Sequence, residues 1–322
     1  MAAKKILVTG GCGFIGSNFV RHMLQKHKDI EITNLDKLTY AGRLESLNDI
    51  ENDSRYSFIK GDICDAAVVE SAMRGCDALL NFAAETHVDR SIADANSFLY
   101  SNFIGVRVLL EQAKKKGIEK FVQISTDEVY GQALKGSFKE TDKLNPRNPY
   151  SAAKAAGELL AMSYFSTFGL PVTVTRSSNN YGMFQFPEKV IPLFVTNLLE
   201  GKKVPLYGEG KQIRDWLFVL DNCEAIDAVL QKGKAGEIYN AGGGNEIANI
   251  ELTKTILEEL GKGNEMIEKV PDRLGHDFRY SLDCNKIKKE LGWEPQTNFK
   301  KGLKQTVKWY VENQQWWKPL KK

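Results

Sequence analysis

The stretch that decides the fold is Lys4-Lys5-Ile6-Leu7-Val8-Thr9-Gly10-Gly11-Cys12-Gly13-Phe14-Ile15-Gly16. Its apolar residues at 5–9 predict a short core strand. Four glycines follow within seven residues, and a helical pattern then runs from about residue 17 to 28. This order of strand, glycines and helix is the context that a dinucleotide fingerprint requires. Glycine lets the backbone approach a pyrophosphate, which the helix N-terminus stabilises.

An acidic residue follows this unit at an informative distance. The next predicted strand, at 30–35, ends at Asp36, twenty residues past Gly16. A carboxylate at this spacing bonds the adenosine ribose hydroxyls, and it would repel a 2′-phosphate. The sequence therefore predicts NAD rather than NADP as cofactor. The alternative is a structural turn followed by an ordinary surface acid.

The rest of the chain alternates between strand and helix patterns. Further strands are predicted at 56–60, 77–82, 121–124, 172–175 and near 237–240. Alternation of this kind predicts an α/β fold with a doubly wound, Rossmann-type parallel sheet covered by helices on both faces. The alternation loosens near Tyr181. We therefore expect an NAD-binding domain at 1–180, with a returning segment near 215–245, and a smaller C-terminal substrate-binding α/β domain at 181–322.

The strand predicted at 121–124 runs into Ser125-Thr126-Asp127-Glu128-Val129-Tyr130-Gly131. In doubly wound folds, ligands bind outside the carboxyl ends of the strands. Two adjacent carboxylates at such a place can act as an acid and a base on one substrate. The alternative is that Asp127 and Glu128 belong to a solvated loop.

A Tyr-x-x-x-Lys spacing occurs three times, at 56–60, 150–154 and 207–211. Residues four apart share a face only on a helix. Only Tyr150 opens a run of strong helix formers, so only Tyr150 and Lys154 are expected to face the same way. A lysine ammonium one turn from a phenol favours the phenolate, which suits Tyr150 to act as a base near neutral pH.

Composition excludes several classes of protein. The chain has 322 residues, of which 42% are hydrophobic and 26% charged, with a net charge of +3. This is ordinary globular composition, and it gives no reason to expect nucleic acid or a membrane surface as partner. No apolar run approaches the roughly 18 residues of a spanning helix.

The cysteine pattern and the N-terminus bear on location and metals. Five widely spaced cysteines include no zinc or redox motif, which favours reduced thiols in the cytoplasm. The predicted strand at residues 5–9 leaves no visible cleavable signal before it. No His-Glu-x-x-His motif is present among the four histidines, and we expect no metal.

Taken together, these motifs resemble the extended short-chain dehydrogenase/reductase family of nucleotide-sugar enzymes over nearly the whole chain. The run at 125–131 is similar to that of the family's 4,6-dehydratases, since its sugar epimerases usually lack the Asp-Glu pair. The same resemblance extends to the segments 179–182, 187–189, 214–216 and 275–277. Two positions depart from it, because Met183 and Leu274 stand where proline is common. Both flank the expected substrate pocket.

The resemblance implies a set of cofactor contacts. The pyrophosphate side of NAD is expected at Gly10, Gly13, Phe14, Ile15 and Gly16, the adenosine ribose at Asp36, Lys37 and Thr39, and the adenine at Asp62 and Ile63. The nicotinamide half is expected at Ala83, Ala84, Glu85, Ser101, Tyr150, Lys154 and Asn180.

The resemblance also implies the substrate and catalytic sets. The nucleotide-sugar is expected to contact Thr86, Thr126, Asn179, Glu188, Lys189, Val190, Val204, Leu206, Arg214, Asn249, Arg273 and His276. The catalytic residues are expected to be Thr126, Asp127, Glu128, Tyr150 and Lys154.

The implied reaction is a closed redox cycle on a nucleotide-activated hexose, with dTDP-glucose the favoured substrate. Tyr150 takes the O4 proton while hydride passes from C4 to NAD. Glu128 then removes the C5 proton, Asp127 protonates the departing C6 hydroxyl, and hydride returns to C6. UDP-glucose and UDP-N-acetylglucosamine are alternative substrates.

Three other readings stay open: a family epimerase, a UDP-glucuronate decarboxylase and a catalytically silent NAD sensor. The resemblance further implies a homodimer, formed through the two long helical segments at about 96–116 and 150–168.

Overall fold

The computed structural model describes residues 4–272 and 275–321. Its centre is a seven-stranded sheet in the order β10-β6-β5-β4-β1-β2-β3, with every pairing parallel. The strands are β1 (Lys5–Thr9), β2 (Glu31–Asp36), β3 (Tyr56–Lys60), β4 (Ala78–Asn81), β5 (Lys120–Thr126), β6 (Val172–Ser177) and β10 (Ile238–Ala241). The predicted doubly wound sheet is therefore confirmed. The strand order reverses between β1 and β4, and a crevice forms there at the carboxyl ends of the strands.

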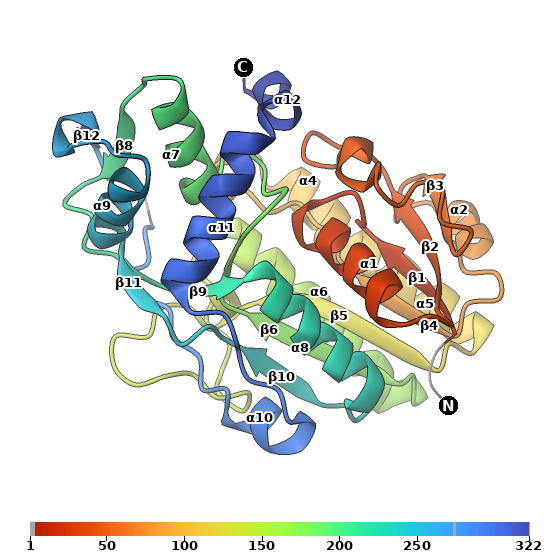
Figure 1. The fold of residues 1–322 in the computed structure, drawn as a ribbon. Helices are drawn as coiled ribbons and strands as arrows, with labels where there is room; N and C mark the ends of the chain where they lie inside the picture. Colours follow the sequence, from red (N-terminus) through yellow and green to blue (C-terminus); the bar gives the residue numbers. More distant parts are fainter. Residues whose placement is uncertain (1–3, 273–274, 322) are drawn as a thin grey trace.

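Helices cover both faces of the sheet (Figure 1). On one face lie α1 (Phe14–Lys26) and α8 (Val219–Lys232), and on the other lie α2 (Ala66–Ala72), α5 (Val106–Lys116) and α6 (Pro149–Phe168). Alternate residues of β1 serve the two faces, because side chains of a strand point to opposite sides. Ile6 and Val8 belong to the α1 and α8 core, whereas Leu7 belongs to the opposite core.

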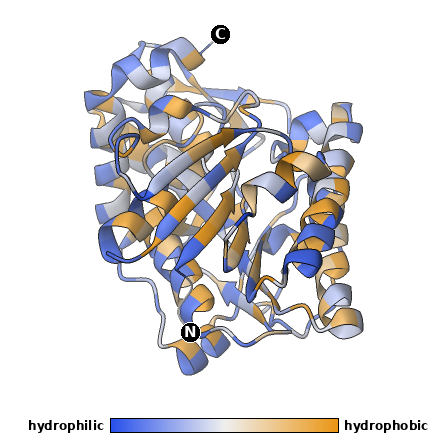
Figure 2. Cartoon of the chain, turned by 90° about the vertical axis from the view of Figure 1, so that its right-hand side faces the viewer, coloured by the Kyte–Doolittle hydropathy of each residue, from blue (hydrophilic) through white to orange (hydrophobic). Residues whose placement is uncertain are grey.

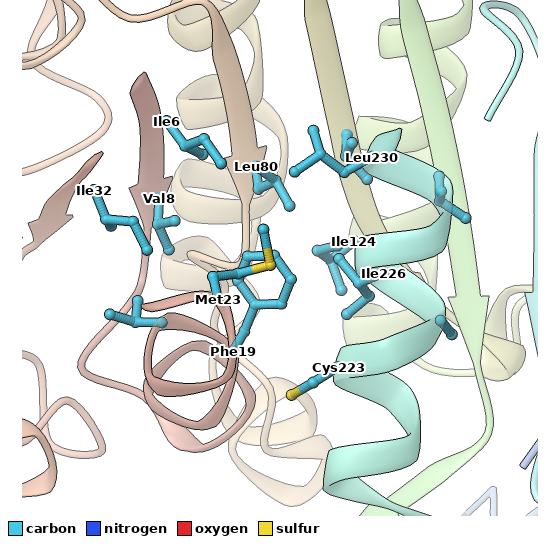
Figure 3. Close-up of a cluster of buried hydrophobic side chains, with 14 of the residues drawn as sticks. Ile6, Val8, Phe19, Met23, Ile32, Leu80, Ile124, Cys223, Ile226 and Leu230 are labelled. Carbon is cyan, nitrogen blue, oxygen red and sulfur yellow. The ribbon is translucent and has the colours of Figure 1, made fainter. Parts of the chain in front are cut away.

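The core between β1 and the helices α1 and α8 fixes where the glycine-rich turn lies. Figure 3 shows side chains from the strands meeting Phe19 and Met23 of α1 and Ile226 of α8. Phe19 and Met23 are fully buried. Each such side chain contributes roughly 1.5–3 kcal/mol by leaving water. This packing holds α1 against the sheet, so that its N-terminus remains at the crevice.

The segment predicted as one helix at about 96–116 is interrupted. It consists of α4 (Asn96–Leu99), a π-helical turn η2 (Tyr100–Gly105) and α5. The side chain of Asn102 is buried in this turn, where it accepts from the backbone N–H of Glu85 at 2.9 Å and donates to its carbonyl at 3.0 Å. Such wide turns occur often at functional sites. Here the turn attaches the helix to the loop that follows β4.

The remaining elements build a second core beside the main sheet. A three-stranded sheet contains β7 (Asn179–Tyr181), β9 (Ile213–Phe218) and β11 (Glu246–Ala248), and β8 (Val204–Tyr207) pairs with β12 (Ile267–Val270). The helices of this part are α7 (Val190–Leu199), α9 (Asn249–Glu259), α11 (Phe299–Glu312) and α12 (Gln314–Trp317). Helix α10 (Asn285–Leu291) packs instead on the main sheet, where Ile287 and Leu291 join the core of α1 and α8. Between β9 and β11 the chain returns to the main sheet as β10, as predicted, and there it pairs with β6. The division into domains at residue 180 stays a prediction.

Hydropathy follows this architecture. Figure 2 shows hydrophobic segments gathered in the strands and in the helices packed against them. Across residues 4–272 and 275–321, no helix combines the length and the apolarity that crossing a membrane requires.

Candidate active site

A pocket opens at the carboxyl ends of β1, β2, β4, β5 and β6. Its lining contains every residue that the sequence assigns to NAD and the whole predicted catalytic set. Residues from positions 10 to 189 of the chain therefore meet in one crevice, as the rule for doubly wound sheets requires.

The glycine-rich turn forms a cradle that side chains would fill. Gly10 has φ +71°, and a Cβ atom there would lie 2.6 Å from the backbone nitrogen of Ala83. A Cβ atom at Gly16 would lie 2.3 Å from the carbonyl oxygen of Gly10. Gly13 caps α1 without any side-chain hydrogen bond. The backbone N–H groups of the first helical turn therefore offer the kind of site that a pyrophosphate of NAD occupies.

The end of β2 holds the buried carboxylate of Asp36 in a fixed position. One oxygen of Asp36 accepts from the backbone N–H of Cys12 at 2.9 Å, and the other accepts from Leu38 at 2.8 Å. Burial raises the pKa of Asp36, while these two hydrogen bonds lower it. Lys37 pairs with Asp62 at 2.7 Å and joins the ends of β2 and β3. The carboxylate of Asp36 is thus fixed at the crevice, as binding of a ribose diol requires.

The end of β5 leads into a single 3₁₀ turn, η3 (Asp127–Tyr130). Thr126 caps this turn: its hydroxyl oxygen accepts from the backbone N–H of Glu128 at 3.3 Å and donates to Oδ1 of Asp127 at 3.1 Å. Asp127 is buried, and its Oδ2 has no hydrogen-bond partner within the described residues. Burial first, and then the charges of Glu128 and Asp215, raise the pKa of Asp127 well above its ordinary value. Asp127 is thereby favoured as a protonated acid.

Tyr150 and Lys154 project from the first turns of α6. Burial and then the nearby Glu128 carboxylate raise the pKa of Tyr150, and a hydrogen bond with Thr126 lowers it. The ammonium of Lys154 donates to the carbonyl of Ile124 at 2.6 Å, and burial lowers the pKa of Lys154 to about 8. Lys154 is not among the groups that shift the pKa of Tyr150 in the protein alone, so the expected lowering of that pKa by Lys154 stays a prediction.

The residues predicted to contact the nucleotide-sugar fall into two groups. Thr86, Thr126, Asn179, Glu188 and Lys189 line the same pocket as the catalytic set. Lys189 donates to the carbonyl of Thr86 at 2.9 Å, so it joins the loop after β4 to the segment before α7.

The other group lies outside this lining, on β8, on β9, at the starts of α7 and α9, and near residue 276. Its members are Val190, Val204, Leu206, Arg214, Asn249 and His276. Val204 and Leu206 are core residues, with 0% and 2% of their surface exposed. His276 pairs with Asp272 at 2.6 Å. Arg273 and Leu274 lie outside the described residues.

Several lining residues were not predicted from the sequence. They are Leu35, Ala41, Gly42, Gly61, Phe82, Ile124, Ser125, Ser177, Ser178, Gln185 and Phe186. Phe82, Ser125 and Ser177 lie at the ends of β4, β5 and β6, so the carboxyl-end rule, applied to every strand, would have included them. Asp215 carries no such signal. It is buried on β9, and the fold brings its carboxylate close enough for its charge to raise the pKa of Asp127.

Comparison with known proteins agrees with this geometry. Residues 7–306 match the family described as GDP-mannose 4,6 dehydratase. A dTDP-glucose 4,6-dehydratase of Streptomyces niveus is 52% identical over 98% of this chain and 96% of its own length, and that of Escherichia coli is 46% identical over 97% and 95%.

Solved structures of nucleotide-sugar enzymes share the fold of this chain. The crystal structure of DesIV, a dTDP-glucose 4,6-dehydratase from Streptomyces venezuelae with NAD bound, is 50% identical and matches with a TM-score of 0.97 over 98% of this chain and 100% of that chain. A UDP-glucose 4-epimerase from Thermotoga maritima is 32% identical, with a TM-score of 0.89 over 96% of this chain and 99% of its own. The chain belongs to the dTDP-glucose 4,6-dehydratase family, within the extended short-chain dehydrogenases/reductases.

Proposed function

We propose that this protein is an NAD-dependent hydro-lyase that converts dTDP-glucose to dTDP-4-keto-6-deoxyglucose and water. One observation carries the proposal. The Asp127 and Glu128 carboxyls lie in the same pocket as Tyr150, Lys154 and the glycine cradle. An enzyme that only oxidises and reduces C4 has no need of a buried acid next to a second carboxylate, whereas loss of water needs both an acid and a base.

The first half-reaction is oxidation at C4. When bound, NAD supplies the hydride acceptor and the positive charge of its oxidised ring. Tyr150 takes the O4 proton, and Thr126, whose side chain hydrogen-bonds Tyr150, orients O4. The raised pKa of Tyr150 means that added positive charge in the pocket is needed for proton transfer near neutral pH. Lys154 holds the cofactor ribose from its place on α6.

The second half-reaction is elimination. The new 4-ketone acidifies the C5 proton, which the Glu128 carboxylate removes. The C6–O bond then breaks, and Asp127 gives its proton to the leaving hydroxyl, so that water departs. The buried position of Asp127 serves this step, because it keeps the carboxyl protonated until the hydroxyl needs a proton. Hydride would then return to C6 while Glu128 gives its proton back to C5, and the proton that Tyr150 took would restore that of Asp127 through solvent. The cycle therefore ends with no net oxidation.

The sugar lies, in this proposal, against Thr86, Thr126, Asn179, Glu188 and Lys189, which share the catalytic pocket. The nucleotide extends toward Val190, Val204, Leu206, Arg214, Asn249, Arg273 and His276. In the described part of this second group, the side chain of Arg214 donates to the carbonyl of Asp277 at 2.9 Å. The substitution His276→Ala should raise the KM for the nucleotide-sugar and leave the affinity for NAD unchanged. Equal losses of both affinities would contradict this placement.

The test of the activity is a substrate screen. The protein is incubated with dTDP-glucose, UDP-glucose or UDP-N-acetylglucosamine, and mass spectrometry follows loss of water. Alkali then develops the near-ultraviolet absorbance of a 4-keto sugar. We expect dehydration of dTDP-glucose at the highest kcat/KM. Interconversion of sugars without loss of water would favour an epimerase, and binding of NAD without turnover would favour a sensor.

We also infer a homodimer. Four large apolar side chains on α4, η2 and α6 are exposed in the single chain: Leu99 (48%), Tyr100 (63%), Leu159 (58%) and Phe168 (53%). Pairing of these helices with those of a second copy would cover them in a four-helix bundle. Light scattering at micromolar concentration should give a dimer. Leu159→Glu should yield monomer, whereas Leu134→Glu, at a 67% exposed leucine outside these helices, should not.

The domain division and the location complete the proposal. We infer that residues 1–180 and the returning segment near 215–245 form the NAD-binding domain, which the pairing of β10 with β6 supports. Limited proteolysis should cut first at residues 190–214 or after residue 245, and NAD should not protect these segments. A cytoplasmic location is supported by five free thiols in the described chain, and recovery of the protein in the cytoplasmic fraction of cells tests it.

A further inference from the structure

A hydrogen bond ties the start of α6 to the second carboxylate of the pocket. Asn148 is the N-cap of α6, and its Oδ1 accepts from the backbone N–H of Ser151 at 2.8 Å. The hydroxyl of Ser151 accepts in turn from the backbone N–H of Asn148 at 3.3 Å, which completes a capping box. With its oxygen turned to the helix, the amide of Asn148 presents Nδ2 to Glu128, and it donates to Oε2 at 3.3 Å.

We propose that Asn148 is a positioning residue for the elimination step, which holds the Glu128 carboxylate where it takes the C5 proton. This inference rests on the proposed function. The hydrogen-bond donors and acceptors of Asn148 account for this role. An asparagine offers one acceptor and one donor group on the same rigid amide. The helix cap uses the acceptor, so the direction of the donor is fixed by the helix itself.

The turn that carries Asn148 is held rigidly. Pro149 occupies the first position of α6, where its fixed φ suits the start of a helix. The backbone N–H of Tyr150 donates to the hydroxyl of Ser91 at 3.2 Å. Tyr150 and Asn148 are two residues apart. One short turn therefore sets the position of the oxidation base directly and that of the elimination base through a hydrogen bond.

Arg147, which precedes Asn148, anchors the same turn to the segment near residue 277. The guanidinium of Arg147 pairs with Oδ1 of Asp277 at 2.7 Å, and the hydroxyl of Tyr280 donates to Oδ2 of Asp277 at 2.6 Å. Asp277 is buried, with 1% of its surface exposed. It follows His276, which the proposed function places at the nucleotide-sugar. The position of Asn148 is thus set between the helix and the 275–280 segment.

Two roles of Asn148 can be separated by substitution. Serine is as good an N-cap as asparagine, so Asn148→Ser should keep the helix start. Its shorter side chain cannot cap the helix and also donate to Glu128. Asn148→Asp also keeps the cap but has no N–H to donate when ionised. Asn298→Ser is the matched control, because Asn298 caps α11 by accepting from Lys300 and lies outside the pocket lining.

The experiment compares the two half-reactions in the holoenzyme with dTDP-glucose. We expect Asn148→Ser to oxidise C4 at the wild-type rate and to release product roughly tenfold more slowly, since a hydrogen bond to a charged group is lost. Absorbance of reduced cofactor should then accumulate transiently, and deuterium uptake from solvent at C5 should slow in parallel. Asn148→Asp should slow product release further because of repulsion from Glu128. Asn298→Ser should match wild type.

Two results would overturn the inference. One is unchanged product release and C5 exchange in Asn148→Ser. The other is an equal loss in both half-reactions, or loss of folding in both Asn148 variants, which would make the residue a helix cap alone. A wild-type protein that removes no water from dTDP-glucose is a different result, because that refutes the proposed function itself.

Discussion

The hydroxyl of Tyr40 donates to Oε1 of Glu188 at 2.7 Å, so the loop after β2 is bonded to the segment before α7. Arg90 reinforces the contact: its guanidinium lies 3.7 Å from the centre of the Tyr40 ring and donates to Oε2 of Glu188 at 3.2 Å. Residues on both sides of this contact line the pocket. The contact therefore joins two segments of the pocket lining, one of which carries Thr39, a residue expected at the adenosine ribose.

This contact should slow the release of NAD, which a closed redox cycle has to retain. Tyr40→Phe removes the hydroxyl and keeps the ring under Arg90. Loss of a hydrogen bond to a carboxylate should speed NAD release roughly tenfold. Exchange of bound NAD for a fluorescent analogue measures the rate. Tyr239→Phe is a matched control, because the Tyr239 hydroxyl also donates to a glutamate, Glu290, away from the pocket. Equal exchange rates in Tyr40→Phe and wild type would contradict the role.

Asp36 should set the choice between NAD and NADP. Asp36→Ala removes the carboxylate that would bond the ribose diol and would repel a 2′-phosphate. We expect weaker binding of NAD, a smaller difference between NAD and NADP, and an unchanged circular dichroism spectrum. Binding titrations of the cofactor-free protein measure both affinities. A wild-type protein that binds NADP more tightly than NAD would refute the assignment.

The two carboxyl groups should be needed after oxidation and not before it. Glu128→Gln cannot take the C5 proton, and Asp127→Asn cannot give a proton to the C6 hydroxyl. Each should lower product formation by roughly 10²–10⁴-fold. Both should still form reduced cofactor in a single turnover, because Tyr150 remains in place, whereas Tyr150→Phe should form none. Near wild-type turnover in both carboxyl variants would instead favour an epimerase.

The low pKa of Lys154, about 8, predicts how NAD binding depends on pH. As pH rises through about 8, the cofactor-free protein loses the ammonium that would hold the ribose, so the affinity for NAD should fall. Titrations with NAD at several pH values between roughly 6 and 10 should show the affinity falling as Lys154 loses its proton. Lys154→Met should bind NAD weakly at every pH, with no such fall.

The same pKa predicts an opposite trend for stability. The pKa of Lys154 is lower in the folded chain than its ordinary value, so the unfolded chain binds more protons between the two pKa values. The contribution of Lys154 to the free energy of unfolding therefore rises with pH above about 8, and is least favourable below it. Denaturant titrations of the cofactor-free protein should show this slope, and Lys154→Met should lack it.

A buried ion pair behind the site should matter for stability. The Arg176 guanidinium pairs with Glu158, with its Nε 3.1 Å from both carboxylate oxygens, and both residues are almost fully buried. Removal of one partner leaves a buried charge, which costs roughly 3–5 kcal/mol. We expect this loss for Arg176→Met in urea unfolding. Lys308→Met, which breaks an exposed pair with Glu312, should change the unfolding free energy by less than about 1 kcal/mol.

Much of the fold was predictable, because local patterns decide it. The glycines at 10–16 allow the tight turn against Ala83 that side chains would block, and apolar strands such as β1 alternate between two cores. The return of β10 to the sheet was predicted from a strand pattern at residues 237–240. The π turn η2 was not predicted: its Asn102 is bonded to Glu85, seventeen residues away, and no local pattern marks such a contact.

Some features of the candidate site were likewise predictable from the sequence, and others were not. Residues at strand ends, such as Asp36 and Asp127, were placed by a general rule for parallel sheets. The pKa of Tyr150 was not predictable from its spacing to Lys154. Spacing fixes which helix face the two share, but burial and the charge of Glu128 come from other elements. The Tyr40–Glu188 contact likewise joins residues 148 positions apart, and no pattern in the sequence near either residue indicates it.

The place of β10 in the sheet has a consequence for the order in which the chain folds. β6 ends at Ser177, yet its outer neighbour β10 begins only at Ile238. During synthesis the first six strands of the sheet are therefore complete while one edge of β6 is still unpaired. An unpaired strand edge is a template for association with other chains. Ribosome-bound or truncated chains that end before Ile238 should bind chaperones and aggregate, whereas chains that extend past Ala241 should be protected.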